Sequence, residues 1–233
     1  MDASVKHECK TQECEDTRDR ILTAAQKLFA EKGFDSTSVR DITTEAACNV
    51  ASVNYHFGGK DNLYLETFRS TLKPLREQRL LILGQLMDQA PSPALEEFLH
   101  SFAEGFIDPL VDQRLGRLFM ALVTREMFDP RLPRDVFLSE FIHPVLEKAL
   151  IALEKFGPPL NPADARMCIM AMVGQLLHAL KAHHMFTSHD SEVVPADLAS
   201  YIPHFVRFAA GGIRACAGSN AIDAEEIGEE ALS

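Results

Sequence analysis

The chain of 233 residues has no apolar run approaching the roughly 18–20 residues that a membrane-spanning helix needs. Its first residues also lack the apolar centre of a secretory signal, so we expect a cytoplasmic protein. Glycine and proline, 12 of each, are too few for a collagenous or low-complexity chain. Hydrophobic residues at 46% and charged residues at 24% indicate a globular protein instead.

Cysteine is scarce, and its five positions are scattered and odd in number, which disfavours a disulfide framework and fits a reducing compartment. His7, Cys9 and Cys14 lack the second ligand pair of a structural zinc site, so we expect a loose charged arm there. We interpret Cys48 as a small packing residue rather than a redox switch. The histidines at 178, 183, 184 and 189 do not share one helical face, so we expect no metal.

Signatures of enzymes are also missing. The sequence contains no nucleophile elbow, phosphate-binding loop, zinc-protease pair or dinucleotide fingerprint. We therefore expect neither catalytic residues nor a cofactor, and the search for function turns to binding.

Charge is unevenly distributed along the chain. The net charge is -11, yet residues 17–76 carry nine Lys and Arg against seven Asp and Glu, a local charge of +2. Residues 77–233 carry 12 basic and 22 acidic residues, a local charge of -10. A mildly basic segment joined to an acidic body is typical of a DNA-reading module attached to a regulatory domain.

Apolar residues recur with the helical period almost throughout, as in the stripe Ile21, Leu22, Ala25, Leu28 and Phe29, and no alternating strand pattern competes. We predict an all-α fold, with Pro74 kinking or splitting one long helix and Pro144 interrupting another. The acidic end is expected to be disordered. The expected helices cover residues 17–32, 38–46, 50–56, 60–89, 93–109, 112–128, 133–156, 163–186 and 195–213.

Three short helices ahead of a long one predict a helix-turn-helix, whose second helix enters the major groove. Ser38 and Asp41 have the spacing of a capping box at the start of the middle helix. The run from Gly33 to Phe68, GFDSTSVRDITTEAACNVASVNYHFGGKDNLYLETF, resembles the DNA-binding domain of the TetR family of bacterial transcription regulators. Two departures stand out: Thr43 replaces the usual Ala, and Ala47-Cys48 replaces the commoner Gly-Val at the turn.

The short side chains near the start of the third helix suit contact with base edges, because alanine and valine can touch thymine methyls and asparagine can pair with adenine. The hydroxyls of Thr37 and Ser38, together with the start of their helix, could bind a phosphate. The side chains at positions 40, 55, 56 and 60 could bind further phosphates. Tyr55 could instead fill the small core, and Ser38 caps its helix in either case. The predicted DNA-binding residues are Thr37, Ser38, Arg40, Val50, Ala51, Ser52, Asn54, Tyr55, His56 and Lys60.

The expected organisation is an arm at residues 1–16, a DNA-binding domain at 17–62, a helical regulatory and dimerisation domain at 63–216, and an acidic tail at 217–233. The last two apolar helices, in residues 163–216, could pair with those of a second copy, and the small residues 209–212 would allow close approach. The alternative is that both helices are core of the monomer.

This region more weakly resembles the C-terminal domain of one TetR subgroup. That subgroup shares the sequence VNYHFG of residues 53–58 and includes regulators of drug sensitivity. It implies a pocket for a small, apolar or aromatic effector, although such residues could equally be core. Arg125 and Glu126 could orient a polar ligand or pair with neighbours. The predicted pocket residues are Phe102, Phe106, Phe119, Met120, Val123, Met127, Phe137, Phe141, Met170 and His178.

Together these observations predict a homodimeric, ligand-responsive regulator. The family resemblance implies a repressor that binds a palindromic operator in double-stranded DNA and is released by its effector. The alternatives are an activator of the same family and a helical interaction protein that has lost DNA binding.

Overall fold

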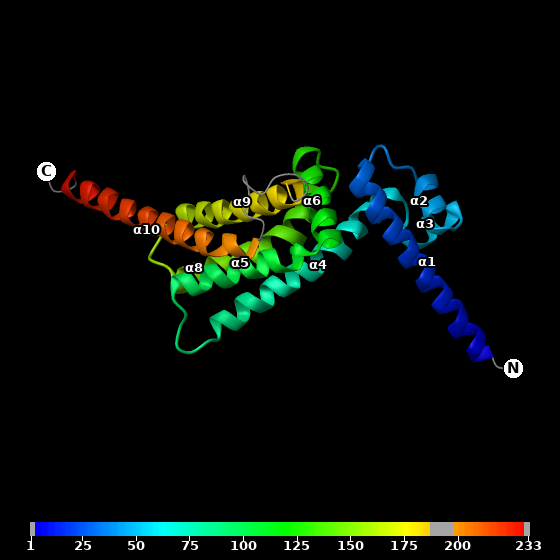
Figure 1. Cartoon of the computed structure of the whole chain (residues 1–233), viewed down its shortest axis with the longest axis horizontal. Helices are drawn as coiled ribbons and strands as arrows, with labels where there is room; N and C mark the ends of the chain where they lie inside the picture. The colour runs from blue at the N-terminus through cyan, green and yellow to red at the C-terminus, as the bar shows by residue number, and fades with distance from the viewer. Residues whose placement is uncertain (1–2, 187–197, 231–233) are drawn as a thin grey trace. The chain divides into compact units, whose positions relative to one another are not determined.

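The computed structural model describes residues 3–186 and 198–230, although not the side chains of residues 3–14, 113, 184, 186, 199 and 219–230. Every regular element within these residues is helical, which confirms the all-α prediction (Figure 1). None of these helices is both long and apolar enough to cross a membrane. The chain divides into two compact units, and each is described by itself.

Unit 1 comprises residues 1–73 and 118–137. It contains α1 (Ala3–Lys32), α2 (Val39–Glu45), α3 (Val50–Phe57) and the first part of α4 (Lys60–Met87). The second part of α6 (Gln113–Phe128) and α7 (Arg134–Phe137) complete it. Its core is fully buried and draws on every one of the first four helices, with Phe29, Ile42, Val53, Leu63 and Phe68 at its centre.

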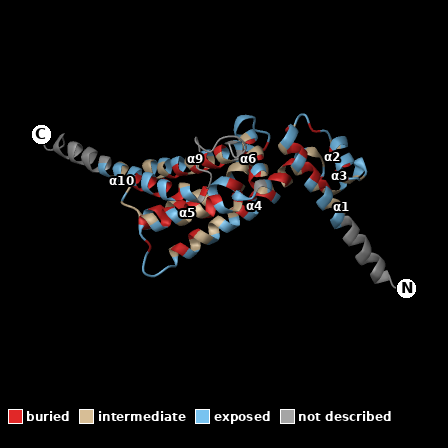
Figure 2. Cartoon of the chain, viewed as in Figure 1, coloured by how far each residue is buried: buried red, intermediate tan, exposed pale blue. Residues whose placement is uncertain are grey.

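Unit 2 comprises residues 74–117 and 138–233. In it α5 (Leu95–Val111) packs against α8 (His143–Phe156), α9 (Pro162–Phe186) and α10 (Leu198–Glu230). The red, buried positions in Figure 2 lie along the faces of these helices that meet one another. Phe98, Leu110, Leu176 and Phe205 are among the buried side chains of this core.

The two prolines singled out in the sequence behave differently. α4 continues through Pro74 as one helix, and the boundary between the units falls at that residue. Pro144 lies in the first turn of α8, directly after a short π-helix, η1 (Leu138–Ile142). A proline cannot donate to the carbonyl four residues earlier, which here is that of Glu140. The Arg76 guanidinium donates to this carbonyl oxygen over 2.7 Å and so satisfies it.

Both ends of the chain are more helical than expected. α1 begins at Ala3, within the predicted arm, and α10 continues to Glu230 through the predicted acidic tail. Residues 3–16 contain neither proline nor glycine, and residues 217–230 contain no proline, so no missing amide interrupts either helix. The units also differ from the boundary expected at residue 62, because the start of α4 and the end of α6 belong to unit 1.

Candidate nucleic-acid interface

The start of α2 is fixed by a reciprocal cap. The backbone amide of Asp41 donates to the Ser38 hydroxyl over 3.1 Å, and the Ser38 amide donates to the Asp41 carboxylate over 2.9 Å. This confirms the predicted capping box, with Asp in place of Glu. The hydrogen bonds from Ser38 hold the pKa of the Asp41 carboxyl below its usual range. Ser38 is exposed, so its helix start faces solvent.

Thr37 has a different place from the one expected. Its side chain is fully buried, and its hydroxyl lies 2.7 Å from the Gly33 carbonyl oxygen and 3.2 Å from that of Leu28. The hydroxyl therefore secures the turn between α1 and α2 rather than facing a phosphate, because it is enclosed by the core of unit 1.

The turn between α2 and α3 is a Schellman motif built without glycine. Ala47 has a positive φ of 50°, in the left-handed region that glycine favours. Its amide donates to the Thr44 carbonyl over 3.2 Å, and the Cys48 amide donates to the Thr43 carbonyl over 3.0 Å. The turn geometry is thus retained, although the usual glycine is absent. The Thr43 hydroxyl, unusual at its position, donates to the carbonyl of Arg40 over 3.2 Å.

α3 presents two different faces. Val53 and Phe57 are buried in unit 1 and fix the helix from one side. Ser52 and His56 are half-buried at the edges. The remaining predicted residues are exposed, and we call them the exposed face of α3: Val50, Ala51, Asn54 and Tyr55.

The caps of α3 include a residue that the sequence reasoning did not select. The Asn49 side chain accepts a 2.9 Å hydrogen bond from the Ala51 amide at the start of the helix. At the other end, Gly58 caps the helix with φ 74°, a conformation that glycine adopts without steric cost. An asparagine directly before an apolar helical run is a capping signal, and it could have identified Asn49 from sequence.

Tyr55 is 79% exposed, which decides between the two roles considered for it: it does not fill the core. Its ring lies edge-on to that of His56, with centroids 4.9 Å apart. Arg40 is exposed on α2. The Lys60 ammonium, at the start of α4, lies 4.1 Å from the centroid of the Phe34 ring, a cation–π contact that positions this charge beside the α3–α4 turn.

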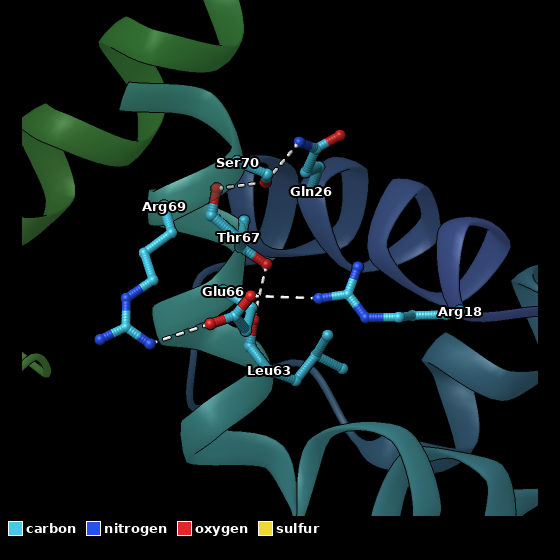
Figure 3. Close-up of polar contacts among 7 residues, drawn as sticks. All are labelled: Arg18, Gln26, Leu63, Glu66, Thr67, Arg69 and Ser70. Atoms are coloured by element: carbon cyan, nitrogen blue, oxygen red, sulfur yellow. Dashed lines mark hydrogen bonds and ion pairs between the residues drawn. The ribbon is translucent and has the colours of Figure 1, made fainter. Parts of the chain in front are cut away.

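Polar contacts join α1 to the first part of α4 (Figure 3). The Glu66 carboxylate accepts from Arg18 over 3.2 Å and from Arg69 over 2.9 Å. The Arg18 guanidinium also lies 5.2 Å from the centroid of the Phe57 ring, at the end of α3. One arginine thus contacts both α4 and the buried face of the helix that carries the predicted base contacts.

The end of α6 is attached to the α1–α2 region by arginines. Arg125 donates to the carbonyl oxygens of Ala30 and Glu31 over 3.3 and 3.0 Å, which satisfies carbonyls at the end of α1. Gly33 lies beside the same guanidinium, because a Cβ there would be 2.9 Å from Arg125 Nη1. Arg131, after α6, forms an ion pair with Asp35.

Glu126 is buried and ties α6 to α4. Its carboxylate accepts from the Tyr64 hydroxyl over 3.2 Å and from the backbone amides of Arg131 and Leu132 over 2.9 and 2.8 Å. Of the two roles considered for Arg125 and Glu126, these contacts match pairing with neighbours. Burial and the adjacent Glu126 carboxylate raise the pKa of Tyr64 far above its usual range.

The predicted pocket residues are divided between the units and differ in exposure. Phe102, Phe106, Phe119, Val123 and Phe141 are buried, and Met120 and Phe137 are half-buried. Met127, Met170 and His178 are exposed. His189, which the metal hypothesis included, lies outside the described residues.

Several cavities lie within the described part of unit 2. One, of about 10 Å³, lies between α4 and α5, and its lining includes Phe102, Phe106 and Arg79. The Arg79 guanidinium lies 3.9 Å from the centroid of the Phe106 ring. Burial lowers the pKa of Arg79 to about 10, which still leaves it charged at neutral pH. A second cavity, of about 490 Å³, lies where α8 ends and α9 begins, and its lining includes Leu153 and Pro159. A third, of about 550 Å³, has Glu96 of α5 and Val206 of α10 in its lining. Sequence reasoning did not anticipate the two larger cavities.

Comparison with known proteins agrees with the domain order. Residues 21–67 match the profile of the bacterial regulatory proteins of the tetR family, and residues 85–212 match that of the tetracyclin repressor-like C-terminal domain. The second match alone spans more than half of the chain. The chain belongs to the TetR family. Its two matched regions are thus the DNA-binding domain of bacterial regulatory proteins and a repressor-like C-terminal domain, in the order that the sequence predicts.

Among relatives of this TetR-family protein, the HTH-type transcriptional repressor NicS of Pseudomonas putida is 30% identical over 90 residues, which are 39% of this chain and 42% of NicS. The negative transcriptional regulator IcaR of the icaADBC biofilm operon in Staphylococcus aureus is 31% identical over 105 residues, 45% of this chain and 53% of IcaR. The chain thus aligns with about half the length or less of these relatives.

The crystal structure of the TetR-family regulator PfmR from Thermus thermophilus is also similar, with a TM-score of 0.58 and 18% identity, covering 81% of this chain and 97% of PfmR. At this identity the likeness shows a shared fold alone.

Proposed function

We propose that this TetR-family protein is a homodimeric repressor whose two copies of α3 occupy successive major grooves of a palindromic operator. The observation that carries the proposal is the division of α3 into a buried face, held by Val53 and Phe57, and an exposed face whose residues other than Tyr55 have short side chains. Short side chains let a helix approach base edges closely, and Asn54 offers an amide that can pair with adenine. The repressor relatives NicS and IcaR favour repression over activation.

Contacts with phosphates position such a helix without reading sequence. The exposed start of α2 at Ser38 and the side chains of Arg40 and Tyr55 supply donors on the same unit as α3. Lys60 supplies a further cation beside the turn. We propose that Ser38, Arg40, Tyr55, His56 and Lys60 contact the DNA backbone, while Val50, Ala51, Ser52 and Asn54 face base edges.

The exposed residues of α9 and α10 support a dimer. Met167, Met170 and Phe208 are 68%, 57% and 62% exposed, so these two neighbouring helices present large apolar side chains to solvent. A Cβ at Gly174, Gly211 or Gly212 would meet nothing within 4 Å, so another helix could approach closely there. A second copy of the same two helices would cover this surface in a symmetric interface.

The effector is proposed to bind within unit 2. Of the pocket residues in this unit, Phe102, Phe106 and Phe141 are buried and remain candidates for an apolar or aromatic ligand wall. The cavity that Phe102 and Phe106 line, about 10 Å³, admits at most one water, so binding requires α4 and α5 to separate. Such a ligand would stabilise a conformation other than the one that fits successive grooves.

Selection of genomic DNA fragments by the full-length protein, followed by sequencing and footprinting, tests the function. We expect an inverted repeat whose half-site centres are about 34–36 Å apart, occupied by one dimer. Enrichment of no sequence, or protection of one isolated half-site by a monomer, would contradict the proposal. Loss of the footprint on adding compounds made or exported by the neighbouring genes' products would identify the effector.

A further inference from the structure

Two cysteines in unit 2 lie on neighbouring helices. α9 and α10 pack side by side (Figure 1). Cys168 is near the start of α9, and Cys216 is in the second half of α10. Residues four apart share a face of a helix. Met172, four residues after Cys168, is buried, and so is Ile213, three residues before Cys216. Each thiol therefore continues a row of side chains that points into the core of unit 2.

The two side chains are neighbours. The Cys216 thiol lies close enough to Cys168 to contribute to the raised pKa of the Cys168 thiol. Both cysteines are half-buried free thiols, which leaves them accessible to a small reagent while the surrounding helices hold them in place. A disulfide needs the sulfurs about 2.0 Å apart and the Cα atoms within roughly 7 Å of each other, a separation that helices packed side by side can offer.

We propose that Cys168 and Cys216 form a reversible intramolecular disulfide that ties α9 to α10. This assigns a redox modification site to the regulatory unit, and it stands independently of the proposed DNA binding. The packed helices hold the two thiols together, which lowers the entropy lost on closing the ring. The cross-link would join residues roughly fifty positions apart in the chain.

The oxidant is a low-molecular-weight disulfide such as oxidised glutathione. One cysteine thiolate attacks a glutathione sulfur and releases one glutathione thiolate, leaving a mixed disulfide on the protein. The second cysteine thiolate attacks the protein sulfur of that mixed disulfide and releases the other glutathione. Two protein thiols are oxidised, one glutathione disulfide is reduced to two thiols, and the two protons end on glutathione.

Burial of the Cys168 thiol limits the rate of this exchange. Burial, with contributions from Cys216 and the Asp164 carboxylate, raises the pKa of the Cys168 thiol to about 11. Little thiolate forms at neutral pH, so exchange is slow there and accelerates as the pH rises. The pair therefore suits a response to sustained oxidation rather than rapid catalysis.

The test uses the full chain with Cys9, Cys14 and Cys48 replaced by Ser, so that only the proposed pair remains. This variant is equilibrated at pH 8 with excess oxidised glutathione, alkylated, and examined by intact mass and peptide mapping. We expect both thiols to resist alkylation, the peptides containing Cys168 and Cys216 to be joined, and dithiothreitol to free them. The Tm is expected to rise by about 5–15 °C on oxidation.

Adding Cys168→Ser provides the matched control, in which Cys216 can form only a mixed disulfide with glutathione and the Tm stays near that of the reduced protein. Two alkylatable thiols after prolonged equilibration, stable mixed disulfides on both cysteines, or a cross-link between two copies would each overturn the proposal. Should the triple variant fail to fold, the same peptide mapping on the wild-type chain decides between these outcomes.

Discussion

At the scale of single residues, Ala47 has a left-handed backbone conformation at a position where the family more commonly has glycine. Its φ of 50° places a Cβ in the left-handed region, which costs an L-residue roughly 1–2 kcal/mol. The motif around it is complete nonetheless, since both hydrogen bonds of the Schellman turn are formed. The position of α3 thus depends on a strained residue between α2 and α3.

Ala47→Gly is expected to raise the free energy of unfolding by about 0.5–1 kcal/mol, because relief of strain exceeds the added freedom of glycine in the unfolded chain. Urea unfolding measures the change. The matched control is Ala121→Gly in the right-handed interior of α6, which should lower stability by about 1 kcal/mol. Equal loss of stability in both variants would show that Ala47 is not strained.

At the scale of elements, the end of α6 forms part of unit 1 through polar contacts. Arg125 caps α1, Arg131 pairs with Asp35, and Glu126 accepts from Tyr64 on α4. A buried carboxylate is stable only when its oxygens are hydrogen-bonded, and Glu126 meets this condition with three donors. Removal of one donor should therefore lower the free energy of unfolding.

Tyr64→Phe is expected to lower the free energy of unfolding at pH 7 by about 1–2 kcal/mol, because the buried Glu126 carboxylate loses the hydroxyl that donates to it. The raised pKa of Tyr64 adds a pH dependence. A phenol whose folded pKa lies above its unfolded value stabilises the fold fully below pH of about 10, and this contribution is lost as the pH rises further.

Thermal unfolding of wild type and variant between pH 7 and 11 measures both effects. The wild type should lose stability above pH 10 more steeply than Tyr64→Phe, so the two curves converge. Tyr55→Phe is the control, since Tyr55 is 79% exposed, and it should leave the free energy of unfolding at pH 7 unchanged. Parallel curves for wild type and Tyr64→Phe over the whole range would contradict the role given to Tyr64.

The helices and the capping box followed from sequence because they depend on local chemistry, namely apolar period, caps and breakers. The buried position of the Thr37 side chain could not be predicted from sequence. A threonine beside a helix start has the same local sequence whether its hydroxyl faces solvent or donates to carbonyls nine and four residues earlier. The same holds for Arg125 and Glu126, whose partners in α1 and α4 lie 94 and 62 residues away in sequence. Contacts this distant leave no local pattern.

At the scale of the whole molecule, the proposed dimer predicts a specific weakness. Met170→Glu combined with Phe208→Glu places two charges on the exposed apolar surface of α9 and α10. Because these side chains are exposed in the monomer, the variant should fold, yet it should sediment as a monomer at concentrations where the wild type is dimeric.

Leu81→Glu is the control, since Leu81 is 60% exposed on α4 and lies outside α9 and α10. It should leave the oligomeric state unchanged. A double variant that remains dimeric, or a wild type that is monomeric at micromolar concentration, would refute the assignment of this surface to a second copy.

The central claim is that Val50, Ala51, Ser52 and Asn54 of α3 read base sequence while neighbouring groups contact phosphates. Titration of the selected operator and of an unrelated duplex against salt, with wild type, Asn54→Ala and Lys60→Ala, tests it most directly. Asn54→Ala should weaken operator binding by about 1–3 kcal/mol and spare the unrelated duplex, whereas Lys60→Ala should weaken both and reduce the salt slope by about 1. Identical titrations for all three proteins, or no salt-dependent binding by the wild type, would contradict the account.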